Sequence, residues 1–179
     1  SFDKVKLMTL GMLSNKESDF DYIANLNLQK LIFADTPFAH AYSGDVKSMK
    51  ALKLKEVEAF YKDHMILENV IIVAGGDIEL EDIKKALLPI LSEIKKGKVK
   101  EIPYYDAQKN AKEVVIEKES EQAYIYFGAP FYMKSGDENA YKAKVASFIL
   151  GESGFGSRLM EEIRVKRGLA YSSYSRTSI

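Results

Sequence analysis

The stretch LGESGFGSRLMEEIRVKRGLAYSSYS, residues 150–175, carries the most specific pattern in this chain. Three glycines precede Ser157, a helix-forming segment follows, and Gly168 separates that segment from a run of tyrosine and serine. Ser157 is typical of a helix N-cap, and Gly168 stands where a left-handed C-cap is expected. We therefore expect a helix over residues 157–167, a turn at Gly168 and a strand from Tyr171 onward.

All arginines of the chain lie in its last part, at positions 158, 164, 167 and 176, and every other basic side chain is lysine or histidine. An arginine guanidinium is a planar fork that grips carboxylates and carbonyls in a fixed geometry. Arg164 falls on the last turn of the expected helix, and a strand that folds back brings Tyr171 near it. A tyrosine hydroxyl can donate to developing oxyanion charge, so this pair suits the binding of an extended peptide.

A structural alternative exists for the same two residues. Arg164 could pair with Glu161 or Glu162 on its own helix, and Tyr171 could be a core aromatic. Spacing alone favours this alternative, because surface ion pairs are common and contribute little. The expected strand has no aliphatic face, however, which is typical of a segment that borders a cleft or a partner surface.

The glycine-rich loop GESGFGS, residues 151–157, could bind phosphate, because backbone N–H groups at a helix N-terminus attract anions. It lacks the Gly-Lys-Ser/Thr of a P-loop and does not follow an expected strand. A substrate-contact loop fits the pattern better. Its candidate contacts are Gly151, Gly154, Gly156 and Ser157.

Hydrophobic periodicity predicts the other elements. Helices are expected over 2–13, 19–32, 54–63, 80–94 and 137–149, with Pro89 kinking or breaking the fourth. Short β-branched or aromatic runs predict strands at 69–74, 114–116 and 123–127. The expected fold class is α+β, with helices layered on sheets. The lysine-rich residues 95–112 are interpreted as a linker between two domain parts, residues 1–94 and 113–179. The Tyr104–Tyr105 pair in it is either an interaction motif or, as the pattern favours, an aromatic anchor that pins the linker to one domain.

Composition narrows the function classes. Lys plus Arg and Asp plus Glu number 26 each, which gives no electrostatic argument for nucleic acid or an anionic membrane as partner. No apolar run is long enough for a membrane span, so a soluble protein of cytoplasm or periplasm is expected. There is no cysteine, hence no disulfide and no thiolate site. Because an amphipathic helix is already under way at Ser1 and the chain stops within an expected strand, we interpret it as part of a longer protein.

Residues 150–175 resemble the second-domain signature of the pitrilysin/insulinase family of zinc metallopeptidases, which includes the mitochondrial processing peptidases. Segments further upstream are similar in collinear order: EQAYIYFGAPF, NVIIVAGGDI and FADTPFAHAYSGD. In the last of these, Thr36 stands where the family has histidine and Phe38 where it has tyrosine. The resemblance implies that Arg164 holds the substrate backbone and that Tyr171 stabilises the oxyanion.

The resemblance also implies a zinc ion, carried in the first domain by an inverted His-x-x-Glu-His helix. The only histidines here, His40 and His64, lack that spacing. The zinc ligands of the parent enzyme are therefore expected upstream of Ser1, with none in this segment, which alone should not cleave peptides. Expected partners are a peptide or small-protein substrate and a homo- or hetero-dimer with family subunits.

Two functions follow from these expectations. The first is a segment of a zinc endopeptidase that supplies substrate-binding and oxyanion-stabilising residues. The second is a non-catalytic scaffold or substrate-presenting subunit of the same family, and the Thr36 substitution keeps it open. A third class, a binding module unrelated to peptidases, would make the collinear resemblance accidental.

Overall fold

The computed structural model describes residues 1–110, 112–134 and 136–178. Within them the chain forms two compact units, Ser1–Phe127 and Gly128–Ile179. Ala111 of the expected linker and Ile179 of the expected last strand lie outside the described residues. The linker role of residues 95–112, and the domain parts on either side of it, stay predictions.

The first unit begins with two helices whose ends follow from local hydrogen bonding. Helix α1 spans Phe2–Lys16 and α2 spans Phe20–Ile32. The Asp19 side chain caps α2 by accepting a hydrogen bond from the backbone N–H of Tyr22 at 3.1 Å. Such a cap satisfies an N–H group that has no partner inside the helix, which is why the sequence located this boundary correctly.

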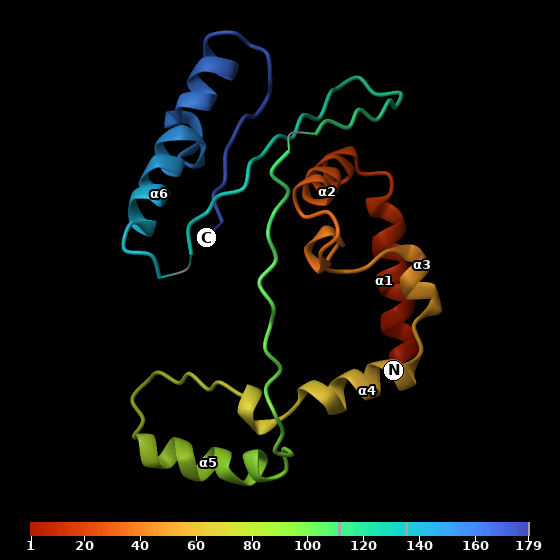
Figure 1. The fold of residues 1–179 in the computed structure, drawn as a ribbon, viewed down its shortest axis with the longest axis vertical. Helices are drawn as coiled ribbons and strands as arrows, with labels where there is room; N and C mark the ends of the chain where they lie inside the picture. The colour runs from red at the N-terminus through yellow and green to blue at the C-terminus, as the bar shows by residue number, and fades with distance from the viewer. Residues whose placement is uncertain (111, 135, 179) are drawn as a thin grey trace. The chain divides into compact units, whose positions relative to one another are not determined.

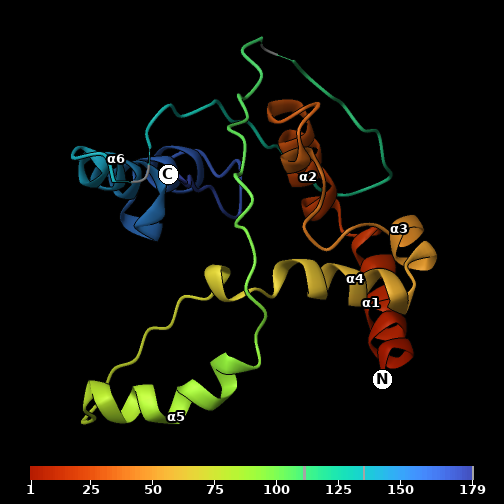
Figure 2. The ribbon, with the colours of Figure 1, turned by 60° about the horizontal axis from the view of Figure 1, so that its bottom comes forward.

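A short helix that the periodicity did not predict, α3 (Val46–Ala51), packs beside α1 (Figures 1 and 2). A capping box between Asp45 and Ser48 starts it. Lys6 of α1 donates to the carbonyls of Lys50 and Leu52, at 2.8 and 2.6 Å, where α3 ends. This lysine satisfies carbonyls that the end of a helix leaves without partners.

The rest of the first unit consists of η1 (Pro37–Ala39), α4 (Leu54–His64), η2 (Leu67–Asn69) and α5 (Leu80–Ser92). Helix α5 continues through Pro89 to Ser92, so the expected break does not occur. After α5 the chain returns to η2. There the Leu67 N–H donates to the Lys95 carbonyl at 2.9 Å, and Ile66, only 4% exposed, packs where a side chain on Gly97 would stand.

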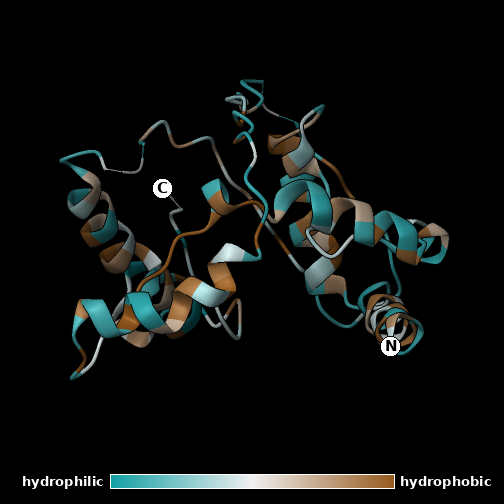
Figure 3. Cartoon of the chain, turned by 90° about the horizontal axis from the view of Figure 1, so that it is seen from below, coloured by the Kyte–Doolittle hydropathy of each residue, from teal (hydrophilic) through white to brown (hydrophobic). Residues whose placement is uncertain are grey.

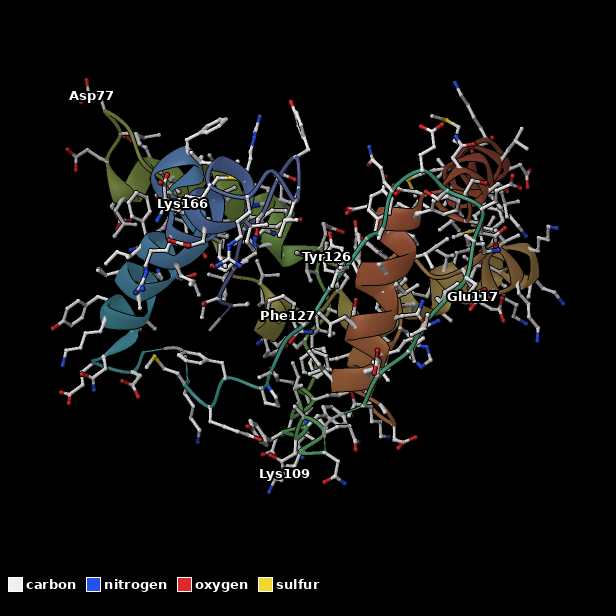
Figure 4. All side chains as sticks on the ribbon, turned by 90° about the horizontal axis from the view of Figure 1, so that it is seen from above. Asp77, Lys109, Glu117, Tyr126, Phe127 and Lys166 are labelled. Atoms are coloured by element: carbon white, nitrogen blue, oxygen red, sulfur yellow. The ribbon has the colours of Figure 1, made fainter. Side chains whose placement is uncertain are left out.

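Residues 105–108 and 124–126 contact α2 and the segment after it. The ring of Tyr105 meets that of Phe38 edge-on, with the centroids 5.8 Å apart. Of the expected Tyr104–Tyr105 anchor, only Tyr105 makes a ring contact with a described residue, and its role in pinning a linker stays a prediction. The Gln108 N–H donates to the Ile32 carbonyl at 2.7 Å. Tyr126, labelled in Figure 4, donates its hydroxyl to Asp21 at 2.9 Å.

The second unit holds α6 (Ala140–Ser147), a π-helical turn η3 (Phe148–Glu152), a 3-10 turn η4 (Gly154–Gly156) and a second π-helical segment η5 (Met160–Val165). After η5 the chain turns at Gly168, and residues 169–178 contain no further helix. The buried side chains of this unit include Met160, which is 7% exposed, and the polar residues Ser147 and Ser157.

The expected α+β fold is wrong. No residue in the described ranges belongs to a β-strand, and the regular elements are all helical. The segments 69–74, 114–116, 123–127 and 171–178, expected as strands, contain no residue in a strand. A β-branched run favours a pleated, half-buried surface, but a strand exists only when a second segment accepts and donates its backbone hydrogen bonds. None of the four finds such a partner here.

Because the sheet is absent, many apolar side chains expected in a core are exposed. Ile71 and Val73 are 89% and 92% exposed, and Ile125 is 80% exposed. Figure 3 shows hydrophobic positions on the coil segments as well as on the helices. In the described part of the chain, the buried hydrophobic residues are Leu13, Ile66 and Met160.

Candidate functional site

The candidate site belongs to the second unit and is built on two turns that need glycine. Gly151 lies within the π-helical turn η3, in contact with the last segment: a Cβ there would lie 2.2 Å from the backbone nitrogen of Ser175. Gly168 has φ 61°, and its N–H donates to the Arg164 carbonyl at 2.9 Å. This is the left-handed cap that the sequence predicts, and it reverses the chain directly after η5.

The reversal brings Tyr171 back to Arg164, as the sequence predicts. The guanidinium carbon of Arg164 lies over the Tyr171 ring, 4.6 Å from its centroid. The same carbon lies over the ring of Phe155, at 4.7 Å from the centroid. Phe155 comes from the glycine-rich turn η4, so one turn before Arg164 and one turn after it supply aromatic rings to the same guanidinium. Arginine stacks in this way because its charge is delocalised and weakly hydrated.

Neither part of the structural alternative describes these two residues. Glu162 pairs with Lys166 at 2.6 Å (Lys166 is labelled in Figure 4), and no ion pair joins Arg164 to an acid within the described ranges. Tyr171 is 84% exposed, so it is not a core aromatic. The guanidinium N–H groups of Arg164 and the hydroxyl of Tyr171 form no hydrogen bond with any described residue.

Glu152, at the end of η3, ties the last segment to the helical part of the unit. Its Oε1 accepts a hydrogen bond from the Ser147 hydroxyl at 2.7 Å and another from the Thr177 N–H at 3.1 Å. The Ser147 hydroxyl, then the Thr177 N–H and the charge of Arg176 hold the pKa of the Glu152 carboxyl below its ordinary value. The Ser175 hydroxyl also donates to the Ser147 carbonyl at 3.4 Å. Sequence reasoning missed this carboxylate, because its partners lie up to 25 residues away.

The remaining loop candidates fall into two groups. Ser157 is 0% exposed, and its hydroxyl accepts from the Met160 N–H at 3.3 Å, which confirms its capping role. Gly151 is also buried. Gly154 and Gly156 are exposed on either side of Phe155. These two glycines are open to solvent, whereas the two buried residues shape the turn.

The two histidines belong to the first unit. The His64 ring stacks on that of Phe60 with the centroids 4.0 Å apart, and its Nδ1 lies 3.0 Å from the Phe60 carbonyl. Among the described residues, no group of three His, Cys, Asp or Glu side chains could hold a metal ion. The residues present therefore do not fit zinc. In the same ranges no helix combines the length and apolarity that a membrane crossing requires.

Comparison with known proteins decides the family. A family model described as the peptidase M16 inactive domain matches residues 51–179, which is more than half of the chain. The chain belongs to the peptidase M16 inactive-domain family. The resemblance inferred from residues 150–175 to pitrilysin/insulinase metallopeptidases is thereby confirmed.

Relatives of this M16 chain carry two kinds of name. A Helicobacter pylori protein named non-peptidase homolog YmxG is 42% identical over 99% of this chain and 41% of its own length. Proteins named uncharacterized zinc protease are 28% identical in Streptomyces coelicolor and 27% identical in Bacillus subtilis, over 82% and 87% of this chain. The chain spans 33% and 37% of those two relatives, so it corresponds to less than half of each.

A solved structure is also similar to this M16 chain. It is described as a peptidase M16 inactive domain from Pseudomonas fluorescens, with a TM-score of 0.74 and 25% sequence identity. The match covers 99% of this chain and 43% of that chain.

Proposed function

We propose that this chain is a non-catalytic, peptide-holding part of an M16 protein, in which Arg164 and Tyr171 grip a substrate or partner peptide. The observation that carries the proposal is the set of contacts that the Arg164 guanidinium makes. Its guanidinium lies over the rings of Phe155 and Tyr171, and no described acid pairs with it. A fixed guanidinium with free N–H groups suits the carbonyl and carboxylate oxygens of an extended peptide.

One further point supports the non-catalytic form of the proposal: the 42% identical relative is named a non-peptidase homolog. The exposed Gly154 and Gly156 would let a peptide backbone approach the turn closely, because they have no side chains. Such a part could act as a scaffold or substrate-presenting subunit that pairs with another M16 subunit.

Peptide binding by the full-length protein tests this function. The probe is a fluorescein-labelled, disordered peptide of mixed sequence, followed by fluorescence anisotropy, and mass spectrometry of the same peptide detects cleavage. We expect binding without cleavage, and an Arg164→Ala variant should bind roughly tenfold or more weakly, since a hydrogen bond to a charged group is lost. Arg167→Ala is the matched control, because Arg167 is an exposed neighbour without a ring contact. Equal affinity of the wild type and Arg164→Ala would refute the proposed role.

A second function is favoured by the relatives named zinc protease. Here the whole protein is a zinc endopeptidase whose metal ligands precede Ser1, Arg164 holds the peptide backbone and the Tyr171 hydroxyl donates to the oxyanion. The exposure of that hydroxyl is compatible with this role. Zinc analysis of the full-length protein, purified without chelator, separates the two functions. About one zinc per chain together with peptide cleavage would establish the second function, and a folded, zinc-free protein would exclude it.

A further inference from the structure

Phe155 has a position that the family resemblance did not assign. It stands in the middle of η4, between Gly154, whose φ is 67°, and Gly156. Its side chain is 67% exposed. A phenylalanine this exposed contributes little to a core. Within the described part of the chain, the guanidinium of Arg164 lies over the Phe155 ring.

We propose that Phe155 is a positioning residue for Arg164: the glycine-rich turn places its ring against the guanidinium and so fixes the direction of the free N–H groups. The inference deepens the proposed function and rests on it. Arg164 is itself only partly exposed, and among the described residues no acid pairs with it. A long side chain without such a partner loses rotational freedom when it binds, and this loss weakens binding. Rings that already hold the guanidinium reduce that loss.

The proposal gives the glycine-rich turn a second role besides access for the peptide backbone. Gly154 adopts a left-handed conformation that most residues disfavour, and this conformation sets the direction in which η4 presents its next residue. Tyr171 reaches Arg164 from the other turn, after Gly168. The two turns therefore act on the same side chain, and a movement of η4 would change the affinity of the Arg164 site.

Three substitutions test the role in the full-length protein with the fluorescein-labelled peptide. Phe155→Leu removes the ring but keeps an apolar side chain, and it should weaken binding about two- to fivefold, the range of an exposed cation–π contact. Phe155→Tyr keeps the ring and should bind the peptide with wild-type affinity. Phe131→Leu is the matched control, because Phe131 is an exposed phenylalanine of the same unit, 51% accessible, and it should bind as the wild type does.

A second measurement reads the position of Arg164 itself. In the ¹⁵N-labelled protein without peptide, the Nε–Hε resonance of Arg164 lies in the ring currents of Phe155 and Tyr171. Phe155→Leu should shift this resonance, and Phe131→Leu should leave it in place. An unshifted resonance in Phe155→Leu would overturn the contact and hence the positioning role.

The binding results distinguish failure of the positioning role from failure of the proposed peptide-binding function. If Arg164→Ala loses affinity while Phe155→Leu binds as the wild type does, the positioning role fails and the peptide site stands. If both variants bind as the wild type does, the proposed function fails, and the inference fails with it. Weaker binding in Phe155→Leu without recovery in Phe155→Tyr would also overturn the role, because the ring would then not be what matters.

Discussion

Gly151 and the backbone nitrogen of Ser175 are so close that a Cβ on Gly151 would lie 2.2 Å from that nitrogen. The contact fixes the last segment against η3, next to the hydrogen bonds of Glu152. It depends on the absence of a side chain at one position, and backbone atoms on the other side of the contact cannot rotate away. The path of the chain after Tyr171 is therefore coupled to the π-helical turn.

Gly151→Ala should displace residues 175–177 from η3. We expect a loss of about 1–3 kcal/mol in the free energy of unfolding, typical of an overpacked contact, measured by urea denaturation. Proteolysis of the last segment should become faster as well. Gly156→Ala is the matched control, because the nearest atom to its Cβ is the Ser153 hydroxyl oxygen at 4.0 Å. Equal stability of the two variants would show that the close contact is not maintained in solution.

Acid should release the last segment through Glu152. The pKa of the carboxyl is lowered in the folded protein, first by the Ser147 hydroxyl and then by the Thr177 N–H. A group with a lowered folded pKa stabilises the fold above its unfolded pKa, and this contribution is lost as the pH falls through the folded pKa. The amide resonance of Thr177 should therefore move as the pH falls below the ordinary glutamate range.

Glu152→Gln is the control for this titration. Glutamine keeps the size of the side chain and an oxygen that can accept the same hydrogen bonds, but it does not ionise in this range. The Thr177 resonance of Glu152→Gln should lack the acid transition. A transition that persists unchanged in the variant would assign it to another group.

Substitutions at Tyr171 separate the ring from the hydroxyl. Tyr171→Phe keeps the ring under Arg164 and removes only the hydroxyl, so the non-catalytic function predicts a loss of peptide affinity of about two- to tenfold, the worth of one hydrogen bond. Tyr171→Leu removes the ring as well and should weaken binding about two- to fivefold further. If the full-length protein is a peptidase, Tyr171→Phe should instead slow single-turnover cleavage roughly ten- to a thousandfold through loss of the hydroxyl donor. An unchanged cleavage rate would exclude the oxyanion role.

The aromatic contact in the first unit offers a stability test. Tyr105 meets Phe38 edge-on, whereas its neighbour Tyr104 is 75% exposed and makes no ring contact with any described residue. Tyr105→Ala should lower the free energy of unfolding by about 0.5–1.5 kcal/mol from the ring contact. Tyr104→Ala should change it little. Thermal unfolding followed by circular dichroism compares the two, and a larger loss in Tyr104→Ala would contradict the anchoring role of Tyr105.

Features that depend on neighbours in sequence were predicted well. Asp19, Ser157 and Gly168 cap or end their helices where the sequence indicates, because a cap is satisfied within three or four residues. The pairing of Arg164 with Tyr171 follows from the same locality, since one left-handed glycine is enough to reverse the chain between them.

The sequence by itself determined these caps, most of the helices and the family signature in residues 150–175. Only the tertiary structure decided that the β-branched runs remain unpaired and that the Arg164 guanidinium lies over the Phe155 ring. It also decided that Glu152 accepts a hydrogen bond from the Thr177 N–H. The physical reason is the same in each case. A strand and the hydrogen bond between Glu152 and Thr177 need partners distant in sequence, and the contact of Phe155 with Arg164 depends on how the η4 turn is oriented against η5. Local propensity specifies none of these.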